Sequence, residues 1–132
     1  MVKQIKKLTL SDEQRLELRI YQILRLSCVP IERRGGRILF AAIKLCVLDI
    51  VYLDAMTKLL YPKLAELFET TPSCVEKNIR EAVAYGWHGG MDEFFEKNLL
   101  PISKKPSNSM FIKQIVFLIK FFAENEQNIV EL

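Results

Sequence analysis

The stretch LAELFETTPSCVEKNIREAV, residues 64–83, decides the fold of this 132-residue chain. Thr71 and Pro72 in its middle are typical of a helix start, because threonine caps the first turn and proline fits the first helical position. Apolar residues recur at helical spacing on both sides of the short turn Glu69-Thr70-Thr71. The stretch therefore predicts two helices joined by a tight turn, which is the helix-turn-helix arrangement.

Both predicted helices have an apolar face that is expected to point inward. The inward positions are Leu64, Ala65 and Phe68 on the first helix, and Val75, Ile79, Ala82 and Val83 on the second. A rotation of 100° per residue places Ser73, Cys74, Lys77, Arg80 and Glu81 on the opposite face of the second helix. If the unit docks on DNA, this face enters the major groove. The alternative is a helical hairpin whose outer face meets only water.

The remainder of the chain also has helical periodicity, and no segment alternates with a period of two. The length fits one domain, 1–132, in the all-α class: a compact bundle of about six helices that contains the helix-turn-helix. The helix at 71–87 should end at Gly89-Gly90. A basic turn at 33–37 should precede a helix that runs to about residue 51, and the helix at 53–68 should have a kink or break at Pro62. The other predicted helices cover 11–27, 91–98 and 109–124.

Positive charge is concentrated in the N-terminal third. Residues 1–45 contain ten Lys or Arg against four Asp or Glu, although the net charge of the whole chain is only +3. Such an excess attracts phosphates without regard to sequence. A solvated helix face with scattered lysines explains the same count, so charge alone does not assign a function.

Several classes of protein are disfavoured by composition. Three cysteines at 28, 46 and 74 with no close pair argue against a disulfide framework, and with one histidine they make a metal site or bound cofactor unexpected. The apolar runs 38–56 and 111–122 are interrupted by charges or too short to cross a bilayer. No secretory signal opens the chain. We expect a cytoplasmic protein without a membrane segment.

An enzyme is also not expected. Cys74 and His88 lie fourteen residues apart on one predicted helix, about 21 Å at 1.5 Å per residue, which is too far for a nucleophile and its base. His88 is better explained by the C-terminal end of the helix dipole. The pairs Gly35-Gly36 and Gly89-Gly90 are isolated and form no phosphate-binding glycine loop.

Three longer pieces make the pattern far more specific than a generic helix-turn-helix: VPIERRGGRILFAAI (29–43), TKLLYPKLAELFETTPSCVEKNIREAVAYGW (57–87) and KKPSNSMFI (104–112). In their order and spacing they resemble the C-terminal DNA-binding effector domain of the master response regulator of sporulation initiation in endospore-forming Firmicutes. The resemblance implies a six-helix domain that binds DNA upstream of regulated genes, commonly as a dimer. It places the effector-like domain at 29–124, its helix-turn-helix at about 57–88, and an added N-terminal helix at 1–28.

The chain departs from the resembled domain on the recognition helix. That family typically carries arginine where this chain has Cys74 and Lys77, and histidine where it has Glu81, whereas Glu76 and Arg80 match. Arginine bonds bidentately to guanine, for about 1–3 kcal/mol of discrimination, and cysteine cannot. Glu81 places a negative charge where phosphates would lie. The departures predict either an altered DNA site or a reduced affinity.

The resemblance also bears on regulation, because the family couples this domain to an N-terminal phosphoacceptor receiver. About 28 residues precede the matching region here. If Met1 is the natural start, the chain has no phosphoacceptor domain of its own and is not controlled by aspartyl phosphorylation in cis.

The candidate site follows from the docking of the second helix on double-stranded DNA. Thr71 and the first helical turn should bind phosphate through backbone N–H groups. Ser73, Glu76, Lys77 and Arg80 should reach base edges beside Cys74 and Glu81. The candidate contacts to the DNA backbone are Arg33, Arg34, Arg37, Lys104 and Lys105.

A competing hypothesis is a protein-interaction module that has lost operator reading and captures a full-length sporulation regulator in a heterodimer. That regulator and RNA polymerase are the candidate protein partners. A homodimer is also expected, because residues 111–122 are apolar around nearly the whole helix and would need cover on two sides. The alternative is that the helix at 11–27 supplies the second cover within one chain.

Overall fold

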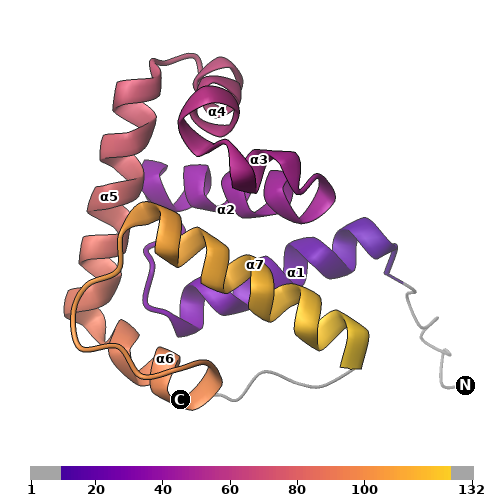
Figure 1. Cartoon of the computed structure of the whole chain (residues 1–132), viewed down its shortest axis with the longest axis vertical. Coiled ribbons are helices and arrows are strands. Elements are labelled where there is room, and N and C mark those ends of the chain that lie inside the picture. The colour runs from indigo at the N-terminus through magenta and orange to yellow at the C-terminus, as the bar shows by residue number, and fades with distance from the viewer. Residues whose placement is uncertain (1–9, 126–132) are drawn as a thin grey trace, which may run out of the picture.

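Every regular element of the structure is helical within residues 10–125, the part that this computed structural model describes, with side chains as far as Phe121. The elements are α1 (Asp12–Leu26), α2 (Arg34–Leu48), α3 (Val51–Asp54), the π-helix η1 (Met56–Leu60), α4 (Tyr61–Leu67), α5 (Pro72–Gly89), α6 (Met91–Asn98) and α7 (Asn108–Asn125) (Figure 1). The all-α prediction is confirmed. No helix in this part of the chain is long and apolar enough to cross a membrane.

Helix α2 is the centre of the bundle, because it packs against α1, α3, α4, α5 and α7. Its side chains Ile38, Leu39 and Ile43 are fully buried. Figure 1 shows α4 beside the N-terminal end of α5 and α6 beside the other end. The helix-turn-helix of α4 and α5 is thus held from behind by α2.

Local sequence signals set the helix ends as expected. Ser11 caps α1 in a capping box, in which its hydroxyl accepts from the Gln14 N–H and the Gln14 side chain accepts from the Ser11 N–H. Gly90, with φ of 114°, ends α5 in the left-handed region that glycine adopts without strain. The predicted spans of α1, α5, α6 and α7 agree with the structure to within two residues.

The expected basic turn at 33–37 is wrong, because α2 begins at Arg34 and includes both glycines. A Cβ on Gly35 would overlap the carbonyl oxygen of Asn78 and lie 2.9 Å from the Ala82 Cβ, both on α5. A Cβ on Gly36 would overlap the carbonyl oxygen of Pro30. These glycines are therefore required by close packing, and not by a turn.

The expected helix at 53–68 is divided into three pieces. Asp54 ends α3, and Ala55, with φ of −140°, turns the chain into the π-helix η1. Pro62 lies in the first turn of α4, where its missing N–H costs nothing. The proline thus marks a helix start, and the break lies seven residues before it.

Helix α7 is covered mainly from within the chain. It packs against α2, α5 and α1, and Phe111, Ile112 and Ile115 are fully buried. The alternative in which α1 supplies part of the cover is thus observed. Phe117 and Phe121 stay 57% and 42% exposed, with ring centroids 6.1 Å apart. The homodimer stays a prediction, and this aromatic pair is the surface that α7 offers for it.

Two non-glycine residues adopt left-handed backbone angles directly after a helix. Cys28 has φ of 67° after α1, and Glu69 has φ of 53° after α4. At Glu69 the turn is closed by two backbone bonds: Glu69 N–H to Glu66 O at 3.3 Å, and Thr70 N–H to Ala65 O at 2.9 Å. This is the helix ending that usually contains glycine. The turn of the helix-turn-helix therefore holds a strained residue.

Replacement of Glu69 by glycine should stabilise the protein. The left-handed conformation costs a residue with a Cβ about 1–2 kcal/mol, and the greater freedom of glycine in the unfolded chain offsets about half of that. We expect Glu69→Gly to raise the free energy of unfolding by about 0.5–1 kcal/mol in urea denaturation. The control Glu66→Gly, within α4, should lower it by about 1 kcal/mol. A destabilised Glu69→Gly protein would contradict the strain at this turn.

Candidate nucleic-acid interface

Helices α4 and α5 form the predicted helix-turn-helix. The hydroxyl of Thr71 accepts a hydrogen bond from the Cys74 N–H at 3.2 Å, and Pro72 occupies the first helical position. Ala65 of α4 is 5% exposed where the two helices meet. The predicted inward stripe is confirmed, because Val75, Ile79, Ala82 and Val83 are all buried.

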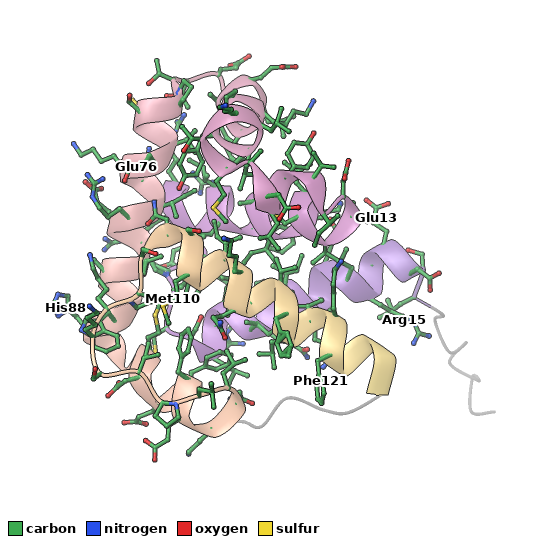
Figure 2. All side chains as sticks on the ribbon, in the orientation of Figure 1. Glu13, Arg15, Glu76, His88, Met110 and Phe121 are labelled. Atoms are coloured by element: carbon green, nitrogen blue, oxygen red, sulfur yellow. The ribbon has the colours of Figure 1, made fainter. Side chains whose placement is uncertain are left out.

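The opposite side of α5 points to solvent, as the 100° count predicts. Figure 2 shows Glu76 on the N-terminal part of α5, which runs along the margin of the molecule (Figure 2). Ser73, Cys74, Lys77, Arg80 and Glu81 are exposed, and Glu76 is half-buried. We call these six residues the recognition face.

Each cation of the recognition face is paired with a carboxylate one helical turn away. Arg80 donates to both carboxylate oxygens of Glu76, and the Lys77 Nζ lies 4.0 Å from the Glu81 Oε1. Exposed pairs at this spacing stabilise a helix by only about 0.3–0.5 kcal/mol, so they can be exchanged for other partners. The recognition face nevertheless carries two positive and two negative side chains and has no net charge.

A hollow of about 830 Å³ lies between α5, the loop at 101–107 and the start of α7. Glu76 and Arg80 line it from α5, and Lys104 and Lys105 line it from the loop. The two lysines are exposed. The structure therefore brings two of the five predicted backbone contacts beside the recognition face, although they lie more than twenty residues away in the chain.

Asn108, at the start of α7, joins the loop to the recognition helix. Its side-chain N–H donates to the backbone oxygen of Glu76 at 3.0 Å and to the hydroxyl of Tyr61 at 3.4 Å. The Ser107 hydroxyl accepts from the Met110 N–H at 3.1 Å and so caps α7. Asn108 thus connects α4, α5 and α7 at one point behind the hollow.

The three arginines of the α2 region each have an intramolecular partner. Arg34 donates to the carbonyl oxygen of Phe68 at 2.9 Å, and Arg37 donates to that of Glu32 at 2.7 Å. The Arg33 guanidinium lies 4.6 Å from the centre of the Tyr85 ring. Arg34 therefore satisfies the C-terminal end of α4 and ties α2 to the turn of the helix-turn-helix.

The α2 arginines also reach the recognition face. Arg33, Arg34 and Glu81 line one small cavity of about 170 Å³ between α2 and α5. Glu81 thus pairs with Lys77 on its own helix and shares a cavity with two arginines of the α2 region.

Several contributors to the interface were not identified from the sequence. Tyr61 and Asn108 hold the recognition helix from behind, and Asn78 donates to the backbone oxygen of Cys74 at 2.7 Å. The contact of Asn78 could have been found from the sequence, because an asparagine within a helix can bond to the carbonyl oxygen four residues before it. Asn108 lies more than thirty residues from its partner Glu76, and nothing in one sequence joins the two.

Cys74 has an unusual environment for an exposed thiol. Hydrogen bonding to Thr71 first, then to Thr70, together with the charge of Lys77, lowers the pKa of Cys74 below its ordinary value. Burial has the opposite effect on Cys46 and raises its pKa to about 12. The three cysteines are all unpaired as thiols in the described structure. Cys74 is therefore the thiol with the most thiolate at neutral pH.

Alkylation should distinguish the three cysteines. A lowered pKa increases the thiolate fraction near neutrality, so at pH 7.5 iodoacetamide should modify Cys74 first and Cys46 only after unfolding, as followed by peptide mass spectrometry. Thr71→Val should slow the reaction at Cys74, because it removes the hydroxyl that bonds to the thiolate. Faster modification of Cys28, whose pKa burial raises, would contradict this ranking.

Cys74 and His88, the pair weighed in the sequence as a nucleophile and its base, are far apart on α5. Cys74 and His88 lie in its first and last turns, as the count along the helix predicts. Phe94 and Phe95 are fully buried in the core, and so they are unavailable as a base-stacking surface. Within residues 10–125 no three His, Cys, Asp or Glu side chains are grouped as metal ligands.

The sequence matches the family described as "Sporulation initiation factor Spo0A C terminal" over residues 20–119. The matched region begins within α1, ends within α7, and includes the helix-turn-helix, the α2 arginines and the loop with Lys104 and Lys105. It covers most of the chain, and it confirms the resemblance found from the three sequence pieces. The chain therefore belongs to the Spo0A C-terminal family, the DNA-binding effector domains of sporulation regulators.

Proposed function

We propose that this chain is a sequence-specific transcriptional regulator that inserts α5 into the major groove of double-stranded DNA. The observation that carries the proposal is the recognition face: a polar, exposed side of α5 opposite a fully buried apolar stripe, in a helix-turn-helix of this family. A helix held in this way can approach DNA without disturbing the core.

Phosphate binding would position α5 before any base is read. The first turn of an α-helix offers backbone N–H groups and the positive end of the dipole, and Thr71 orients this turn. Lys104 and Lys105 line the hollow on one side of the recognition face, and Arg33 lines the small cavity with Glu81 on the other. Arg37, in the first turn of α2, is a further candidate for phosphate binding. Arg34, because of its bond to Phe68, supports the turn as well as adding positive charge.

Base reading requires an exchange of partners. Arg80 would release Glu76 and donate to guanine, while Glu76 would accept from a cytosine amino group. Lys77 would likewise leave Glu81, and Ser73 would reach the nearest base edge. Each exchange gives up an exposed ion pair that is worth only a few tenths of a kcal/mol.

A second function is favoured by one specific observation, the zero net charge of the recognition face. DNA affinity depends largely on uncompensated cations, and here Glu76 and Glu81 compensate both of them. A domain with weak operator reading could act instead by pairing with a full-length regulator. In either case we propose that pairing, with a second copy or with such a regulator, uses the exposed rings of Phe117 and Phe121.

DNA binding should weaken steeply with salt, because cations displace the counterions of DNA. We expect a log–log slope of about −0.9 for each phosphate contacted, measured by gel shift against a family-type site with a scrambled duplex as control. Arg80→Ala should cost on the order of 1–3 kcal/mol and relax the preference at one base pair.

The matched control is Arg15→Ala, an exposed arginine at the end of the molecule opposite Glu76 (Figure 2). It should leave binding unchanged. Undetectable binding of every duplex at low salt would end the transcription-factor proposal and favour the protein-interaction function.

Restoration of the family's residue types should strengthen DNA binding. The double variant Cys74→Arg with Glu81→His adds a guanine-binding fork and removes a carboxylate that repels phosphate. We expect about 2–4 kcal/mol tighter binding to a family-type site.

Glu96→Arg on α6 controls for net charge alone, because it replaces one negative side chain by a positive one and so matches the charge change of the double variant with neutral histidine, and because Glu96 is exposed on a helix at the far end of α5. This control should change the affinity much less than the double variant does. Equal affinities of the double variant and the parent chain would mean that the recognition face does not approach DNA.

A further inference from the structure

We propose that the groove between α1, α2 and α7 binds an acidic amphipathic helix of a partner protein. The groove encloses about 1000 Å³ and lies at the end of the molecule away from the recognition face. Figure 2 shows this separation, with Arg15 and Glu13 at one end and Glu76 at the other. Occupation of the groove would leave α5 accessible, so the inference does not rest on DNA binding.

The floor of the groove is apolar. Leu16 of α1, Val47 of α2 and Ile119 of α7 line it, and Leu48 lies at its edge. Leu48 is the last residue of α2, and its side chain is 65% exposed although it is a large aliphatic group. A large aliphatic side chain in this position adds to binding when a partner removes it from water, by an amount that depends on the area covered.

The rim of the groove is positive. Its lining holds four cations, Arg15, Arg19, Lys44 and Lys120, against the two carboxylates of Asp12 and Glu13. Lys44 is already engaged, with its Nζ 2.7 Å from Glu13 and 3.1 Å from Glu17. The remaining three cations come from both walls, two from α1 and one from α7. They would flank a ligand on its two sides.

The shape and the charge together favour a helix that carries carboxylates. The walls are two helices with a third beneath them, so a fourth helix, about 10 Å across, would complete a bundle. Leucines at positions i, i+4, i+7 and i+11 would contact the floor, and flanking glutamates would meet the arginines. An apolar floor contributes nothing to binding of a phosphate backbone, which makes nucleic acid the weaker candidate.

A defined probe tests the proposal with the full chain. The probe is a fluorescein-labelled 16-residue helical peptide with leucine at those four positions and glutamate at most others, titrated in fluorescence anisotropy. Its controls are a scrambled peptide of equal composition and a version with lysine for glutamate. We expect the acidic amphipathic peptide to bind at least tenfold more tightly than either control. Equal binding of the three peptides would overturn the proposal.

Variants locate the binding. Charge reversal by Arg15→Glu with Arg19→Glu should weaken peptide binding at least tenfold, and Leu48→Ser should weaken it severalfold without unfolding, since Leu48 is exposed. The control for each of the two reversals taken singly is Arg25→Glu, which reverses an exposed arginine of α1 outside the groove, near Tyr21. It should leave peptide affinity within twofold, and all variants should retain DNA binding and the circular dichroism of the parent chain.

Two outcomes would replace the partner helix with something else. Peptide binding that is unaffected by the Arg15→Glu and Arg19→Glu reversals would place the site elsewhere. Binding to phosphatidylglycerol vesicles with the expected sensitivity to these variants, without binding of the peptide, would identify the groove as a membrane-surface site. Because DNA binding is measured in the same proteins, failure of this inference is distinguishable from failure of the proposed function.

Discussion

The contact between the first turn of α2 and the backbone of α5 is the constraint on which the rest of the structure depends. No side chain fits at Gly35, because the Asn78 carbonyl and Ala82 of α5 fill that space, and Gly36 is filled in the same way by Pro30. Arg34, which precedes these two glycines, donates to the carbonyl oxygen of Phe68 at the C-terminal end of α4. Arg34 and Gly35 therefore fix the two helices of the helix-turn-helix against α2, and Gly36 packs the start of α2 on Pro30. The orientation of the recognition face follows from this contact.

Much of the fold was predictable because its signals are local. The side chains of Ser11 and Thr71 bond to backbone only three residues away, and Gly90 ends a helix by its own backbone freedom. The two wrong expectations, the turn at 33–37 and the position of the break within 53–68, share a different cause. Gly35 and Gly36 resemble a turn in sequence, and only their distant neighbours reveal a crowded helix. The break after Asp54 is equally hidden, because a π-turn has no distinctive residue pattern.

The recognition face was predictable for a similar reason, since a count of 100° per residue separates inward from outward positions on any regular helix. Its ion pairs were readable as well, because Glu76 and Arg80, and Lys77 and Glu81, are each four residues apart. What a single sequence could not supply was the second half of the interface. Asn108 contacts the backbone of Glu76 across more than thirty residues, and that contact brings Lys104 and Lys105 beside α5.

The paired charges of the recognition face have a consequence for the ionic atmosphere around the protein. Glu76 and Glu81 act as tethered counterions, which remain beside Arg80 and Lys77 whatever the bulk salt concentration is. A mobile anion leaves and gains entropy when a cation reaches phosphate, whereas a tethered one stays and must find a new place within the complex. In the proposed DNA complex we therefore expect the salt dependence to come from the cations of the α2 region and of the loop at 101–107. In that complex α5 would contribute to selectivity and little to long-range attraction.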